Sequence, residues 1–169
     1  MVLAELHSAT GDQEDTQREG FIMPGGYPIL SDANYAYFVT TTIVEWLPVF
    51  VSPPYYDIII DSLEYVRTHK GVQLNASVIL PTHLHLILWP EPEANLSNIL
   101  RDFKRYTSRA ISAQLEAERR HHFLSILAAA KRRGEGRESA QYRVWQQGSH
   151  PEAIYSEPFF RQKLEYLHN

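Results

Sequence analysis

Hydrophobic positions recur along this chain with two different periods, which divide most of it into strands and helices. Alternating or continuous apolar runs rich in β-branched and aromatic residues predict strands, whereas apolar positions three and four apart predict helices. The predicted strands are residues 37–46, 74–80, 83–89 and 142–146. The predicted helices are residues 55–69, 96–117, 122–132 and 158–167.

The order of these elements predicts the fold class. Strand, helix, strand, strand, helix, strand is the order of an α+β fold, the ferredoxin-like or RRM-like split β-α-β sandwich, with helices on one face of an antiparallel sheet. Residues 1–34 are polar and lack a period, so we expect a flexible N-terminal segment there. Residues 35–169 then form the one folded domain.

Composition narrows the class of protein. A chain of 169 residues with 44% hydrophobic content can bury one good core. It has no cysteine, which excludes disulfides and thiolate metal sites. No apolar run approaches the length of a membrane span, and the N-terminus does not look like a secretory signal. We therefore expect a cytoplasmic protein without membrane contact.

The strongest chemical signal is His83-Leu84-His85, inside the apolar run at 78–89. Residues two apart on a strand point the same way, so both imidazoles can reach one divalent cation. The same pattern also fits a structural pair, in which one histidine caps the strand end and the other is a hydrogen-bonded core residue. The sequence leaves both interpretations open at this point.

The helix at 96–117 carries Tyr106 at the edge of its apolar stripe and a basic flank beside it. Charge is divided unevenly: residues 1–100 hold 3 Lys+Arg and 12 Asp+Glu, residues 101–143 hold 11 and 5, and residues 144–169 hold 2 and 3. A basic middle segment in an acidic protein indicates phosphate binding, although a solvated helix face would look the same. The candidate phosphate contacts are Arg101, Lys104, Arg105 and Arg109.

Two blocks resemble the signatures of the single-tyrosine transposases with a histidine-hydrophobic-histidine motif, in particular the REP-associated tyrosine transposases. They are Pro81-Thr82-His83-Leu84-His85-Leu86-Ile87 and Arg101-Asp102-Phe103-Lys104-Arg105-Tyr106-Thr107-Ser108. Supporting blocks lie at 37–42, 144–151 and 163–169. The similarity runs from about residue 36 to the last residue.

The resemblance implies a site. His83 and His85 would bind Mg²⁺ or Mn²⁺, and Tyr106 would be the nucleophile that cuts single-stranded DNA, leaving a 5'-phosphotyrosine link and a free 3'-hydroxyl. Many members carry a Gln or Asn ligand one turn after the tyrosine, but this chain has Ala110 there. Asp102 and His150 are the candidates for a third ligand.

The resemblance therefore predicts a metal-dependent DNA transposase that acts by transesterification. Its expected partner is single-stranded DNA, in the form of hairpin-forming element ends, and a homodimer is left open. Two rival functions remain: a non-catalytic single-stranded DNA-binding protein, which Ala110 favours, and a metal-dependent phosphodiesterase that uses water. Trp145 either stacks on unpaired bases or belongs to the core.

Overall fold

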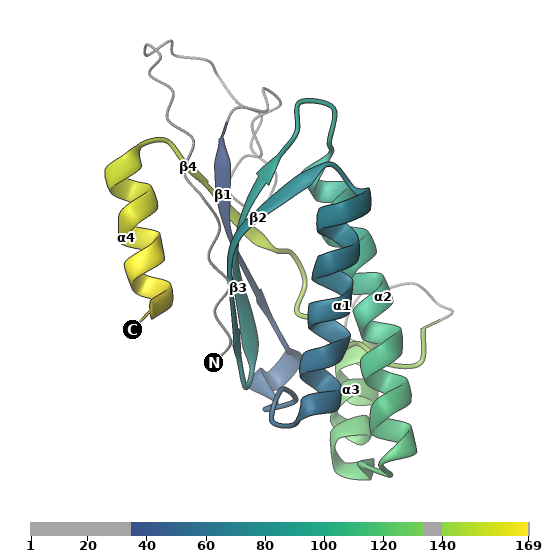
Figure 1. The fold of residues 1–169 in the computed structure, drawn as a ribbon. Helices are drawn as coiled ribbons and strands as arrows, with labels where there is room; N and C mark the ends of the chain where they lie inside the picture. The colour runs from purple at the N-terminus through teal and green to yellow at the C-terminus, as the bar shows by residue number, and fades with distance from the viewer. Residues whose placement is uncertain (1–34, 134–139, 169) are drawn as a thin grey trace.

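The computed structural model describes residues 35–133 and 140–168, which build a four-stranded antiparallel sheet with helices on both faces (Figure 1). The elements are β1 (Ala36–Thr42), the 3-10 helix η1 (Val44–Trp46), α1 (Pro53–His69), β2 (Val72–Leu80), β3 (His83–Pro90), α2 (Leu96–Ala117), α3 (His121–Arg133), β4 (His150–Ile154) and α4 (Glu157–His168). The strand order is β2-β3-β1-β4. The predicted α+β fold class is confirmed, whereas the segment predicted at 1–34 lies outside the described residues.

The central strand β3 has two buried faces, and its alternation assigns them. Leu84, Leu86 and Leu88 are at most 1% exposed and belong to the larger core, which α1 and α2 close over one face of the sheet. Ile87, 0% exposed, belongs to a second, smaller core on the opposite face. The two histidines share this second face with Ile87, because side chains on a strand alternate.

Helix α4 covers the second face. Its apolar residues Phe159, Phe160, Leu164 and Leu167 pack with Phe38, Ile87 and Val78 of the sheet. Figure 1 shows α4 on the side of the sheet opposite α1 and α2. The sequence predicts helices on one face of the sheet, whereas the structure has helices on both faces. None of the described helices is long and apolar enough to cross a bilayer.

Helix α2 has the bounds that its apolar period predicts, 96 to 117. Asn95 caps it, with its side-chain oxygen accepting a hydrogen bond from the Asn98 backbone amide at 2.9 Å. Thr107, in the buried stripe of the helix, accepts a hydrogen bond from the Trp145 indole nitrogen at 3.0 Å. Because Trp145 is 5% exposed, it belongs to the core and has no free face for a base.

One predicted strand is present but shorter than expected, and another is wrong. The strand expected to run to Trp46 ends at Thr42, because Glu45 and Trp46 have φ angles of 55° and 53°, a left-handed conformation that costs about 1–2 kcal/mol per residue. The strand expected at 142–146 is reduced to one bridge between Ile43 and Trp145. The fourth strand is β4, and it pairs with β1. Its short, Pro-containing sequence has little strand period.

The hydrogen bond between Thr107 and Trp145 predicts a measurable coupling. Thr107→Val keeps the shape but leaves the indole N–H buried without its acceptor, so we expect a loss of about 1–3 kcal/mol in unfolding free energy. Combining Thr107→Val with Trp145→Phe should cost less than the sum of the two single changes, since the donor is then absent too. Urea unfolding of the three variants measures this. Additive losses would mean that the bond contributes nothing.

Candidate functional site

His83 and His85 form a pair on the α4 side of β3. Their ring centroids lie 4.8 Å apart at an interplanar angle of 83°. Each Nδ1 is engaged by a threonine hydroxyl: Thr82 at 2.8 Å for His83 and Thr40 at 2.9 Å for His85. The Nε2 of His85 is buried and has no hydrogen-bond partner in the described part of the chain. This nitrogen is therefore a buried acceptor or donor whose hydrogen-bonding capacity no described residue satisfies.

The environment keeps both imidazoles neutral. Burial lowers the pKa of His83. Burial, and then the charges of His83 and Lys163, lower the pKa of His85 to about 4. A neutral imidazole has a lone pair to give to a metal, whereas an imidazolium has none. Both histidines are thus in the protonation state of a ligand at neutral pH.

The pair fits a divalent cation in part. The threonine hydroxyls fix the ring orientations at Nδ1, as partners of metal-bound histidines commonly do, and the orphaned Nε2 of His85 is the atom that a cation would satisfy. Within residues 35–133 and 140–168, no group of three or more His, Cys, Asp and Glu side chains could hold a metal. Two imidazoles leave the other positions of a cation to water or substrate oxygens, which Mg²⁺ accepts readily.

Of the two predicted third ligands, Asp102 does not join the pair within one chain. Asp102 lies on α2, where its carboxylate forms ion pairs with Lys70 at 3.9 Å, Arg101 at 3.3 Å and Arg105 at 3.6 Å. Its prediction as a ligand is therefore wrong for a site within one chain. The His150 backbone pairs with Thr40, which pairs with His85 on its other side. The placement of the His150 side chain lies outside what the structure describes.

Tyr106 lies on the wrong side of the sheet for these histidines. It is on α2, 61% exposed, and α2 packs on the face that carries Leu84 and Leu86. The histidines point to the opposite face, where α4 lies. The structure thus does not bring the predicted nucleophile and the predicted metal ligands together within one chain, because the four-stranded sheet separates them.

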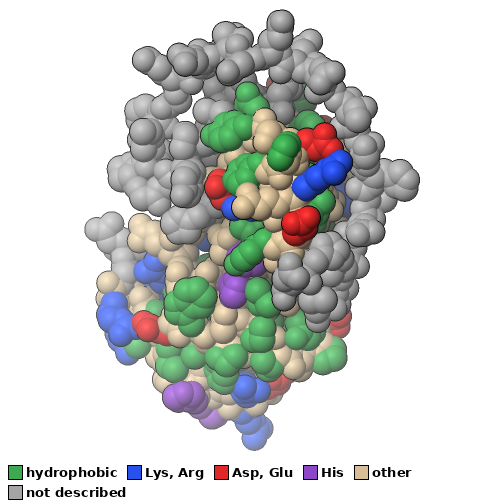
Figure 2. All heavy atoms as spheres, turned by 90° about the vertical axis from the view of Figure 1, so that its left-hand side faces the viewer, with side chains coloured by type: hydrophobic (Ala, Val, Ile, Leu, Met, Phe, Trp, Pro, Cys, Tyr) green, Lys and Arg blue, Asp and Glu red, His purple; other side chains and the backbone are tan. Residues whose placement is uncertain are grey.

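The tyrosine that faces the histidines is Tyr166, near the end of α4. Its ring is 60% exposed and meets His85 edge to face, with the centroids 5.4 Å apart. Figure 2 views the molecule from the α4 side and shows histidine side chains near its centre, among hydrophobic groups. In the sequence, Tyr166 belongs only to the supporting block at 163–169. The apolar period of α4, which points Phe159 and Leu167 at the sheet, was the available signal that α4 needs a buried face.

The four basic residues predicted on α2 separate into two kinds. Burial, and then the charge of Arg143, lower the pKa of Lys104 to about 8. Its ammonium donates hydrogen bonds to the backbone carbonyls of Gln146 and Gly148. Lys104 thus ties the segment before β4 to α2, and it also lines the groove described next, so its role as a phosphate contact stays a prediction.

Arg101, Arg105 and Arg109 are exposed and line an open groove of about 690 Å³. Lys131 and Arg143 add charge from α3 and from the segment after it, and Glu116 is an acidic residue in the same lining. Two of the arginines share the Asp102 carboxylate, so their charge is partly offset. The groove is basic, and it lies along the helix that also carries Tyr106.

Comparison with known proteins shows which solved structures share this fold. No family model and no curated protein matches the chain. A REP-associated tyrosine transposase bound to a REP hairpin superposes with a TM-score of 0.58 at 16% identity, covering 92% of this chain and 71% of that one. A protein assigned as a transposase from Deinococcus radiodurans gives 0.52 at 16% identity, covering 92% and 97%. The chain therefore has the fold of these transposases, as its sequence resemblance predicts.

The lowered pKa of His85 predicts a pH dependence of stability. The unfolded chain binds a proton near pH 6.5 and the folded chain only near pH 4, so folded stability falls as pH drops through this window, by about 3 kcal/mol at most. His85→Gln removes this titration and should flatten the fall. Urea unfolding between pH 7.5 and 4, with EDTA present, measures both proteins. Parallel curves would mean that His85 is not held neutral by the fold.

Proposed function

We propose that this protein is a metal-dependent transposase that cuts and rejoins single-stranded DNA, with Tyr166 as its nucleophile in place of Tyr106. The observation that carries the proposal is the exposed Tyr166 ring, edge to face with His85 on the α4 side of the sheet. The transposase fold of the two structural neighbours supports the reaction class. The hairpin bound by one of them supports a hairpin-forming DNA end as substrate.

His83 and His85 hold the cation, which is Mg²⁺ or Mn²⁺. Imidazole ligands favour Mn²⁺ on grounds of softness, whereas Mg²⁺ is the harder ion. When bound, the cation offsets the negative charge that grows on the phosphate during attack. Thr40 and Thr82 orient the histidines. Their hydroxyls engage Nδ1 of each ring, which leaves Nε2 as the nitrogen available to the cation.

Tyr166 performs the covalent step. Its phenolic oxygen forms a bond to phosphorus and loses its proton to water, while the bond from phosphorus to the 3' oxygen breaks and that oxygen takes up a proton. The products are a 5'-phosphotyrosine and a free 3'-hydroxyl. One phosphodiester replaces another, so the step needs no nucleotide cofactor and runs in reverse to rejoin the strand.

Moving the nucleophile also changes the meaning of Ala110. That residue lies one turn after Tyr106, where many relatives have an amide ligand, and its methyl group was an argument for a non-catalytic protein. With Tyr166 as nucleophile, the amide residue that follows at a similar spacing in the sequence is Asn169, which lies outside the described residues. An amide oxygen of this kind suits Mg²⁺ or Mn²⁺. Asn169 is therefore our candidate for the third ligand.

The exposed arginines of α2 contribute to DNA binding at a distance from the chemistry. Arg101, Arg105 and Arg109 follow one helix flank along the 690 Å³ groove. Guanidinium groups bind phosphates in a sequence-independent way, and this positions a strand without reading it. Because the groove and the histidine pair lie on opposite faces of the sheet, one DNA molecule that uses both must pass around the edge of the domain.

The nucleophile is tested by comparing Tyr166→Phe with Tyr106→Phe. Each change removes one phenolic oxygen and leaves the ring, so the fold should be unaffected. Incubated with a labelled hairpin-ended oligonucleotide and Mn²⁺, the wild type and Tyr106→Phe should give a covalent adduct on a denaturing gel. Tyr166→Phe should reduce the amount of adduct at least about 100-fold, to below detection.

The same gel separates the alternatives. An adduct that disappears with Tyr106→Phe and persists with Tyr166→Phe would contradict the proposal and require a nucleophile supplied by a second copy. Cleavage without any adduct would indicate the phosphodiesterase that uses water. Binding without cleavage by the wild type would indicate the non-catalytic DNA-binding protein.

The metal site is tested without relying on activity. Calorimetry at pH 7.5 measures the affinity for Mn²⁺. We expect the affinity of His83→Gln and of His85→Gln to be at least tenfold weaker than that of the wild type, because each change removes one of two imidazole ligands. Thr40→Val should weaken it less, since it removes only the hydroxyl that orients His85. Undiminished Mn²⁺ binding in both histidine variants would show that the pair is structural.

A further inference from the structure

Trp46 is a large apolar side chain that stays exposed beside the histidine pair. It is 59% exposed, although the nearest apolar residues before and after it in the sequence, Val44 and Leu47, are only 5% and 8% exposed. Its ring centroid lies 5.7 Å from that of His83, at an interplanar angle of 76°. The chain thus buries its apolar neighbours and holds the indole outside the core, next to a candidate ligand.

The backbone around Trp46 is held in an unusual conformation. Glu45 and Trp46 both have positive φ, which is an outlier for a bulky side chain. Hydrogen bonds hold the segment on both sides: before it the Ile43 amide donates to the Thr82 carbonyl at 2.9 Å, and after it the Phe50 amide donates to the Pro81 carbonyl at 3.0 Å. Such a conformation persists only where the surroundings determine it, and it often marks a functional position.

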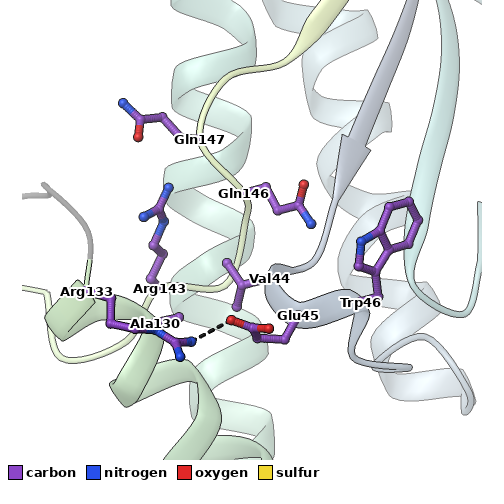
Figure 3. Close-up of a pocket in the computed structure, with 8 residues that line it drawn as sticks. All are labelled: Val44, Glu45, Trp46, Ala130, Arg133, Arg143, Gln146 and Gln147. Carbon is purple, nitrogen blue, oxygen red and sulfur yellow. Dashed lines mark hydrogen bonds and ion pairs between the residues drawn. The ribbon is translucent and has the colours of Figure 1, made fainter.

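The two left-handed residues send their side chains in different directions. Both residues line a pocket of about 330 Å³: Glu45 forms an ion pair there with Arg133, whereas the Trp46 indole extends away from that pair (Figure 3). Arg143 and Gln147 also line the pocket. The turn therefore presents an aromatic ring on the histidine side and a polar, partly cationic pocket behind it. The link from Ile43 to Thr82 places the ring directly beside the start of β3.

We infer that Trp46 is a stacking platform for an unpaired base of the DNA strand whose phosphate lies at His83 and His85. This inference rests on the proposed function. Every base has a flat π face, so stacking on an indole suits a single strand of any sequence. A paired base inside a duplex offers no such face. Trp46 thus selects an unpaired nucleotide next to the scissile phosphate and fixes where the strand enters the site.

The test measures binding of two 20-nucleotide probes, oligothymidylate and the matching abasic oligonucleotide, which keeps the phosphates and lacks the bases. The parent is the Tyr166→Phe variant in Mn²⁺, so that the strand is not cut. Trp46→Ala should weaken oligothymidylate binding about 5- to 100-fold and leave abasic binding within twofold, because stacking requires a base. Trp46→Phe should keep most of the affinity.

Trp89 provides the matched control. It is also on the surface, 36% exposed, but it lies at the other end of β3, so Trp89→Ala should leave both affinities unchanged. Equal weakening of both probes by Trp46→Ala would overturn the inference, since it would show a structural effect. Unchanged oligothymidylate binding would overturn it as well while leaving the Tyr166 proposal intact. A parent that binds neither probe would contradict the proposed function itself.

Discussion

The structure depends on β3 being buried on both sides while carrying two histidines. Leucines at 84, 86 and 88 use one face for the main core under α1 and α2, so the histidines must point to the other face. Burying imidazoles there is costly unless their polar atoms are satisfied. Thr82 and Thr40 satisfy one nitrogen of each ring, and Nε2 of His85 remains without a partner within the described residues. This unsatisfied nitrogen, on the face that α4 covers, is the observation on which our proposal of a cation at the pair rests.

The same constraint underlies our proposal of Tyr166 as the nucleophile. A sheet is a barrier between its two faces, so a helix packed on the leucine face cannot present a side chain to the histidines of its own chain. Helix α2 with Tyr106 lies on that face, and α4 with Tyr166 lies on the other. Both tyrosines are about equally exposed, at 61% and 60%, so exposure alone does not distinguish them. Only the topology does.

The sequence predicts well where a period is long and poorly where a backbone turns sharply. The bounds of α2, and the break between the strands that end at residue 80 and begin at residue 83, follow from apolar spacing, and both are confirmed. The end of β1 was missed because φ at Glu45 and Trp46 cannot be read from residues that favour strands. The role of Lys104 was missed because a lysine on a basic flank looks the same whether it faces solvent or two carbonyls. The face of the sheet on which each helix packs is a tertiary property that the sequence does not show. Without that information, the sequence favours Tyr106.

The central claim, that the histidine pair and Tyr166 form one site, is tested most directly by locating the covalent nucleotide. After reaction of the wild type with a hairpin-ended single strand in Mn²⁺, nuclease trimming and trypsin digestion would leave a short nucleotide on one tyrosine-containing peptide. Cleavage after Lys163 and Arg105 places Tyr166 in peptide 164–169 and Tyr106 in peptide 106–109, which mass spectrometry separates. We predict the added mass on peptide 164–169. The added mass on peptide 106–109 would contradict the account.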